Sequence, residues 1–379
     1  MATGSERSHR LSWEQALAWR MERHHLVHRA APIDLVRVAG DLCGLHAQLM
    51  SSAELSLWAR IDGLEPGALD EALWERRDLV KTWAMRGTLH LLPAAELGLW
   101  LAALGTHTGY GNNRAVTSML AEAVAGALDG RVLTREELAQ AVEQRTGSRQ
   151  FGEWMRYSWG SYLKALAFRS LVCFAPGAGG RVRFTTPSTW VGDRLATWEP
   201  EEALREVTRR FLATYAPATA EDLARWWGVG PARARRMLAG LGDEIVQVWL
   251  DERPRWALAR DVEHLARAAP PGVVRLLPAF DPWVAGASRA EPAALEPRYR
   301  ERVFRPQGWI SPVLLLDGRM AGVWGYTRRS RRLRVEVEPF DGLPAWAREQ
   351  IEAEAQRLAV FLGSQLDLHW HLPSSPSLT

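Results

Sequence analysis

The sequence predicts an α+β fold in which short helices followed by a β-hairpin occur three times in succession. Capping sequences mark helix starts at Thr134 and Thr219, and short polar or glycine-rich turns separate pairs of apolar strands. Beyond residue 270 the pattern changes to a β-meander and a helix. We therefore expect four units, which cover residues 1–92, 93–215, 216–270 and 271–379.

The third unit shows the pattern most clearly. Thr219 precedes Asp222 by three residues, which is a start resembling a capping box, and a glycine-rich turn leads to Pro231 at the start of a second helix. Apolar strands at 244–250 and 255–259 then form a hairpin. Because helix, turn, helix and hairpin make a helix-turn-helix with a wing, we predict three tandem winged-helix modules.

The first and second units follow this plan with more variation. Thr134 and Glu137 form a capping box, and the hairpin of the second unit turns at its glycines. In the first unit the two strands are joined around Arg86 and Gly87. We expect helices at 12–29, 33–43, 51–61, 66–77, 133–144 and 152–169, and strands at 79–85, 87–92, 171–177 and 181–187.

The C-terminal unit should contain a three-stranded meander and a helix that closes the chain. Asp317 and Gly318 form its first tight turn, and the second turn is a run of arginines. We expect a strand-like segment at 273–284, a polar loop at 285–308, the meander at 311–340 and the helix at 345–363.

Composition places the chain among soluble globular proteins, because 47% of its 379 residues are hydrophobic and 24% are charged. No run of about 18 apolar residues could span a membrane, and the N-terminus lacks the apolar segment of a signal peptide. A cytoplasmic location is therefore expected. Cys43 and Cys173 lie in apolar surroundings and should be buried free thiols.

The chain lacks the glycine-rich, serine-elbow and paired-cysteine motifs of nucleotide, nicotinamide and hydrolase sites, so we expect no cofactor. His24, His25 and His28 lie close together, but no carboxylate or cysteine pattern accompanies them. We expect solvated or capping histidines there, no metal site, and a monomeric protein.

Arginine supplies nearly all of the positive charge, because Lys81 and Lys164 are the only lysines, and the net charge is just +3. A GC-rich genome would explain that bias, so the positions of the arginines matter more than their number. A hairpin tip rich in arginine fits a DNA groove, although a solvated turn or one paired with Glu336 and Glu338 is the alternative. We expect DNA contacts from Arg86, from the hairpin residues Arg328, Arg329, Arg331, Arg332 and Arg334, and from the helix residues Arg233, Arg235 and Arg236.

His46 and Gln48 form an unusual polar pair within the apolar segment 41–61. On a helix, two side chains two residues apart point away from each other, so they converge only on an extended backbone. The residues alone favour a hydrogen-bonded core histidine and a loop glutamine over a catalytic pair.

At this segment the chain resembles the AlkZ-like (YcaQ-like) family of winged-helix DNA glycosylases. The resemblance implies three winged-helix modules in a C shape around a DNA-binding cleft, with a catalytic Gln-x-Gln or Gln-x-Asp motif in the first. Members release alkylated bases, including bulky adducts and interstrand crosslinks. The matching stretches are 44–61, 82–97, 219–239, 276–284 and 304–324.

The resemblance implies that His46 and Gln48 are catalytic, with His46 in place of the family's first glutamine. This His-x-Gln variant is associated with self-protection of organisms that make DNA-alkylating compounds. The expected partner is double-stranded DNA carrying alkylated bases. Lys81 and Lys164 match no position for a lyase amine, so we expect a monofunctional glycosylase that leaves an abasic site.

Two non-catalytic functions are the alternatives. A winged-helix transcriptional regulator would hold His46 and Gln48 buried and hydrogen-bonded away from the DNA-facing surface, whereas a glycosylase needs them exposed at the floor of a basic cleft. A winged-helix scaffold for protein interactions would show no salt-dependent binding to DNA.

Overall fold

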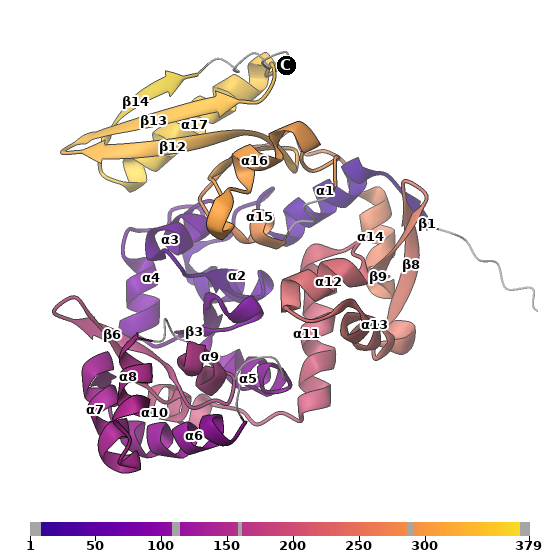
Figure 1. Cartoon of the computed structure of the whole chain (residues 1–379). Helices are drawn as coiled ribbons and strands as arrows, with labels where there is room; N and C mark the ends of the chain where they lie inside the picture. The colour runs from indigo at the N-terminus through magenta and orange to yellow at the C-terminus, as the bar shows by residue number, and fades with distance from the viewer. Residues whose placement is uncertain (1–8, 108–113, 158–160, 287–290, 372–379) are drawn as a thin grey trace, which may run out of the picture.

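The computed structural model describes residues 9–107, 114–157, 161–286 and 291–371 (Figure 1). The C-terminal sheet lies at one end of the molecule and the helices α6 to α8 lie at the other, with the N-terminal segments between them. Among the described residues no helix is both long and apolar enough to cross a bilayer.

The first unit folds into helices around a three-stranded sheet of order β2-β4-β3. The predicted helix 12–29 ends at Arg23, because His25 takes a left-handed backbone conformation with φ 55° that a helix cannot continue through. The elements are α1 Trp13–Arg23, α2 Leu35–Asp41, β2 Leu45–His46, α3 Met50–Trp58, α4 Ala68–Asp70, β3 Leu79–Trp83 and β4 Leu89–Pro93.

The second unit has a sheet of order β5-β7-β6. Its predicted capping box is confirmed, because Thr134 and Glu137 bond each other's backbone N–H groups. The predicted helix 152–169 is two helices. The elements are α5 Leu97–Gly105, α6 Arg114–Leu128, β5 Leu133–Thr134, α7 Arg135–Thr146, α8 Arg149–Tyr157, α9 Ser161–Ala167, β6 Cys173–Ala178, β7 Arg181–Thr185 and α10 Pro187–Val191.

The third unit contains both predicted helices and the predicted hairpin, and Thr219 and Asp222 form the capping box. Its sheet has the order β1-β8-β9, because the N-terminal strand β1 (His9–Leu11) pairs in parallel with β8. Nothing in the sequence indicates that pairing. The elements are α12 Ala220–Trp227, α13 Pro231–Ala239, β8 Ile245–Leu250, β9 Arg253–Leu258 and α14 Val262–Arg267, and they follow α11 Pro200–Tyr215, which ends the second unit.

The C-terminal unit is a five-stranded sheet of order β10-β11-β12-β13-β14. The predicted meander is confirmed, but the helix α17 does not close the chain, because β14 follows it and pairs in parallel with β13. The expected strand 273–284 ends at Leu277. The elements are β10 Val274–Leu277, α15 Pro282–Gly286, α16 Arg300–Val303, β11 Val313–Leu316, β12 Arg319–Arg329, β13 Arg332–Pro339, α17 Ala345–Phe361 and β14 Gln365–Trp370.

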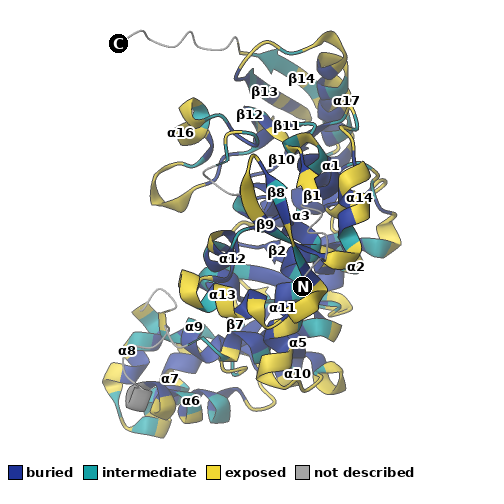
Figure 2. Cartoon of the chain, turned by 90° about the vertical axis from the view of Figure 1, so that its right-hand side faces the viewer, coloured by how far each residue is buried: buried dark blue, intermediate teal, exposed yellow. Residues whose placement is uncertain are grey.

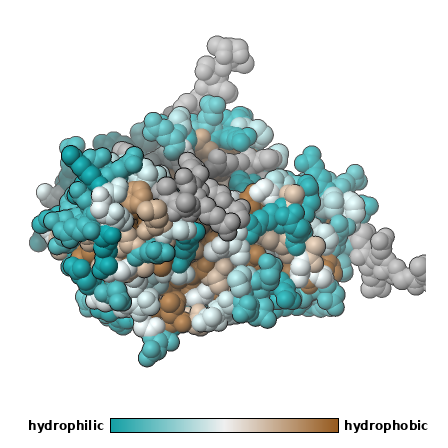
Figure 3. Space-filling view, turned by 60° about the horizontal axis from the view of Figure 1, so that its bottom comes forward, coloured by the Kyte–Doolittle hydropathy of each residue, from teal (hydrophilic) through white to brown (hydrophobic). Residues whose placement is uncertain are grey.

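The sheet β2-β4-β3 lies between two hydrophobic cores. Val80 and Leu92 belong to the core shared with the second and third units, whereas Leu45 and Leu91 belong to the core shared with the C-terminal sheet. Figure 2 shows these central strands buried, with exposed residues on the outer helices. Seen from another side, apolar residues lie in the middle of the face between hydrophilic margins (Figure 3). This buried position fixes the strand that carries His46.

Candidate active site

The short strand β2 brings His46 and Gln48 to the same cleft. Its backbone is extended and pairs antiparallel with β4, with His46 opposite His90. Gly44, at φ 95°, makes the turn into the strand, and a Cβ there would lie 2.7 Å from the Leu92 side chain. Two residues later Gln48 is exposed, and α3 begins at Met50. The backbone is therefore extended at His46, Gln48 follows the strand in a bend, and both side chains line the cleft.

The cleft has a volume of about 760 Å³ and is lined by all four units. Its charged lining groups are Arg86, Arg135, Lys164 and Arg225, and no carboxylate is among the described residues that line it. The helices α9, α12 and α16 lie along one side of the molecule in Figure 2. Residues of α9, of α12 and of the loop that follows α16 line the cleft. His46 and Gln48 therefore both line a basic cleft, but only Gln48 is exposed there, whereas the prediction for a glycosylase was that both would be.

His46 is a neutral histidine at physiological pH. Its ring stacks on Phe280, with 5.0 Å between ring centroids, and meets His90 edge to face at 5.4 Å. Burial, and next the positive charge of Arg86, lower the pKa of His46 to about 4. Its Nδ1 is buried without a hydrogen-bond partner among the described residues. Nε2 is then the ring nitrogen that can meet a water in the cleft.

Phe280 is held against His46 by a strained turn and a buried ion pair. Its backbone is left-handed, with φ 58°, although it is not glycine. The next residue, Asp281, receives two hydrogen bonds of 2.7 Å from the Arg60 guanidinium, and both side chains are fully buried. This turn ends the expected strand early, and nothing in the sequence indicates a role for Asp281 beyond ending that strand.

The predicted hairpin arginines are exposed at the tip of β12 and β13, outside the cleft lining (Figure 1). Arg334 forms an ion pair with Glu336 at 3.1 Å, which agrees with the alternative that arginines at the tip pair with neighbouring glutamates. The other four tip arginines make no ion pair or side-chain hydrogen bond within the described part of the chain. These are Arg328, Arg329, Arg331 and Arg332.

The other predicted arginines are divided between two places. Arg86 lines the cleft, next to His46. Arg233 donates to Thr106 Oγ1 at 2.7 Å and Arg235 pairs with Glu221, whereas Arg236 is exposed; none of the three lines the cleft.

Sequence reasoning missed Arg135 and Lys164 as cleft residues. Arg135 follows the N-cap of α7, and Lys164 lies in α9. Neither lies near the His-x-Gln segment in sequence, so only the packing of the second unit brings them to it. Lys81 instead lies 5.5 Å from the centre of the Phe174 ring, and burial lowers its pKa.

The histidine cluster near residue 24 differs from the expectation. His24 is fully buried between the rings of Tyr215 and Trp283, so it is not solvated. His25 bonds Asp41 at 2.8 Å. Within the described ranges no group of three or more potential ligands could hold a metal ion. Both cysteines are buried and free, as predicted.

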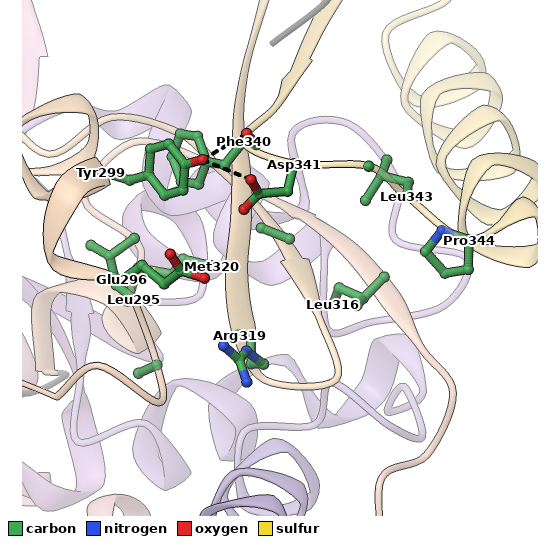
Figure 4. Close-up of a pocket in the computed structure, with 13 residues that line it drawn as sticks. Leu295, Glu296, Tyr299, Leu316, Arg319, Met320, Phe340, Asp341, Leu343 and Pro344 are labelled. Carbon is green, nitrogen blue, oxygen red and sulfur yellow. Dashed lines mark hydrogen bonds between the residues drawn. The ribbon is translucent and has the colours of Figure 1, made fainter. Parts of the chain in front are cut away.

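A second cavity, of about 120 Å³, lies beside β12 and the turn after β13 (Figure 4). There the Tyr299 hydroxyl lies 2.8 Å from the Phe340 carbonyl and 2.9 Å from the Asp341 carboxylate. Arg298 also pairs with Asp341. Because these polar groups satisfy one another, the arrangement fits a structural role.

The comparisons with known proteins identify the family of the chain. The family model of AlkZ-like DNA glycosylases matches residues 39–361. An interstrand DNA cross-link repair glycosylase of Streptomyces sahachiroi is 35% identical over 92% of this chain and 96% of its own length. The solved structure of Streptomyces sahachiroi DNA glycosylase AlkZ matches with a TM-score of 0.86 and 34% identity, over 96% of this chain and all of that one. The chain therefore belongs to the AlkZ-like family and is a DNA glycosylase.

Proposed function

We propose that this DNA glycosylase hydrolyses the N-glycosidic bond of purines alkylated at N7 or N3, and that its substrates include bulky adducts. The observation that carries the proposal is the exposed Gln48 beside a neutral His46 in a basic cleft. The biological role is DNA repair or self-resistance to a DNA-alkylating compound. Since the relative from Streptomyces sahachiroi is named for cross-link repair, interstrand crosslinks are candidate substrates too.

The chemistry needs no strong acid. A purine alkylated at N7 or N3 is cationic, so its glycosidic bond is already weakened and the base leaves without further protonation. Gln48 orients the attacking water with its carbonyl oxygen and faces the positive charge that grows on the sugar. His46 Nε2 accepts a hydrogen bond from the same water. As the new bond forms, the water becomes strongly acidic, so His46 takes its proton in spite of the low pKa of the ring and then passes it to solvent.

We propose that residues 1–92, 93–215 and 216–270 are winged-helix modules, followed by a C-terminal unit at 271–379. Each of the first three contributes helices and a hairpin, whose strands are β3 and β4, β6 and β7, and β8 and β9. Together with the C-terminal unit they surround the cleft in a C shape. The DNA backbone would meet the cleft cations, and the tip arginines of β12 and β13 would contact it further away.

The target base need not enter a deep pocket. Behind His46 the space among Cys43, Arg86 and Tyr215 has a volume of only about 10 Å³, which is room for one water and not for a purine. The open cleft in front of His46 is far larger. We therefore propose that bulky adducts are reached in the cleft without full insertion of the base.

The test is base release by the wild-type protein. Duplexes carrying 7-methylguanine, 3-methyladenine or a bulky N7-guanine adduct are incubated with enzyme, and abasic sites are then cleaved chemically. We expect the enzyme to release free base and to leave an abasic strand that stays intact until the chemical cleavage. Borohydride should trap no covalent complex, whereas trapping that requires Lys164 would show a lyase.

The alternative function, a non-catalytic regulator, predicts no release from any of these duplexes. It also predicts tight binding to one undamaged sequence. The scaffold alternative predicts no salt-dependent DNA binding at all.

The acid side of the pH profile tests the state of His46. Catalysis needs the neutral ring, and a pKa of about 4 keeps it neutral well below the usual value of 6.5. We expect kcat/KM, which reports the free enzyme, to change less than about twofold between pH 7.5 and 5.5. An unshifted histidine would be about 90% protonated at pH 5.5 and would cost about tenfold. A tenfold loss of kcat/KM at pH 5.5 that is absent in His46→Gln would contradict the low pKa of His46.

The hairpin tip is tested by the salt dependence of DNA binding. Changing Arg328, Arg329, Arg331 and Arg332 together to alanine should weaken binding to duplexes of any sequence. It should also reduce the slope of log K against log salt by about one unit for each phosphate that the variant no longer neutralises. The matched control changes Arg149, an exposed arginine of α8 that pairs with Glu153, to alanine. An unchanged slope in the fourfold variant would place the DNA elsewhere.

A further inference from the structure

Trp309 is the most exposed aromatic side chain among the described residues that line the cleft. Its exposed fraction is 43%, whereas Trp83, Phe174 and Phe280 are exposed by 6%, 8% and 9%. Its indole is therefore the aromatic surface that a ligand in the cleft can reach most easily.

The Trp309 ring is held in one place relative to His46. Its loop is closed by the bond from Arg305 N–H to the Trp309 carbonyl, at 2.9 Å, and turns through two left-handed residues, Gln307 and Gly308. The indole meets Phe280 at 74° with 5.0 Å between centroids, and Phe280 in turn stacks on His46. Because the contact with Phe280 is close to perpendicular, a face of the indole can remain available to the cleft.

The charges of the cleft make this face important. Four cations line the cleft, and no carboxylate is found among its described lining residues. Such a lining attracts phosphates but repels a cationic alkylated base. The neutral lining groups that can attract that base include the side-chain carbonyls of Gln48 and Gln307 and the accessible aromatic faces. Among the aromatic faces, Trp309 offers the most accessible one.

We propose that Trp309 stacks on the alkylated purine and makes the enzyme prefer a positively charged base to a neutral one of the same shape. The inference rests on the proposed function, because it takes the alkylated purine as the ligand of the cleft. Cation–π attraction is strongest over tryptophan and corresponds to a preference of about two- to thirtyfold.

The experiment compares two uncleavable probes that differ in charge. Both duplexes carry the same 2′-fluorinated sugar, which resists hydrolysis; the base is cationic N7-methylguanine in one and neutral 7-methyl-7-deazaguanine in the other. Wild type should bind the cationic probe about tenfold more tightly. Trp309→Ala should bring the ratio of the two Kd values close to one, and Trp309→Phe should keep part of the preference.

The matched control is Trp346→Ala, because Trp346 is 38% exposed on α17 and does not line the cleft. It should keep the wild-type ratio. The proposal is overturned if Trp309→Ala weakens binding of both probes equally, which indicates a general wedge or a structural role, or if it changes neither Kd. A wild-type protein that shows the ratio but releases no base would instead contradict the proposed glycosylase reaction.

Discussion

Gln48→Ala is expected to lower the rate of release of 7-methylguanine by about 10² to 10³, the usual cost of losing one preorganised polar group at a developing charge. Gln48 is exposed in the cleft, and no described carboxylate in the lining could replace it. Losing its carbonyl removes both the orientation of the water and the dipole that faces the sugar. The measurement is the single-turnover rate at saturating enzyme, which separates chemistry from binding.

Two further variants sharpen this test. Gln48→Glu keeps a carboxyl oxygen and should retain more activity than the alanine variant. Gln247→Ala removes an exposed glutamine of β8 outside the cleft lining and should match wild type. If Gln48→Ala keeps a third or more of the wild-type rate while binding DNA normally, the glutamine does not handle the water.

Local features of the fold were predictable from sequence. The two threonine capping boxes and the hairpin of β8 and β9 depend on residues within a few positions of each other. Their signals are therefore complete within a short window. The Asp317-Gly318 turn of the meander is predictable for the same reason.

Distant pairing was not predictable. The strand β1 pairs with β8 about 240 residues away, and β14 returns beside β13 after a whole helix. Periodicity in one segment indicates a strand but not its neighbour, and short edge strands carry a weak signal of their own.

The residues of the site likewise divide into those that a local pattern marks and those that only the packing of distant segments brings together. The sequence singled out His46 and Gln48 because polar residues are unusual in an apolar segment, and the family resemblance made them catalytic. Arg135, Lys164 and Trp309 reach the cleft from three separate parts of the chain, so no local pattern marks them. The predicted Arg233 and Arg235 show the converse, because their charge is visible in sequence but their partners Thr106 and Glu221 are not.

Asp281→Ala is expected to lower the free energy of unfolding by about 3–5 kcal/mol, the cost of leaving one charge of a buried pair without its partner. Arg60 and Asp281 are both fully buried and joined by two hydrogen bonds of 2.7 Å. Urea unfolding measures the loss. An exposed pair gives the comparison, because Glu263→Ala, which removes the surface partner of Arg267, should cost no more than about 1 kcal/mol.

The double variant Arg60→Met with Asp281→Leu separates charge from position. Removing both charges should restore much of the stability lost in Asp281→Ala, since an apolar pair of similar volume leaves no buried charge unpaired. Base release should remain low, because the double variant also loses the hydrogen bond of 2.9 Å from the Trp283 backbone N–H to the Asp281 carboxylate. That bond shapes the turn in which Phe280 stacks on His46. A double variant that is both stable and fully active would show that Phe280 keeps its place without the ion pair. Stability without activity would mean that this buried pair is retained for the geometry of the active site rather than for folding.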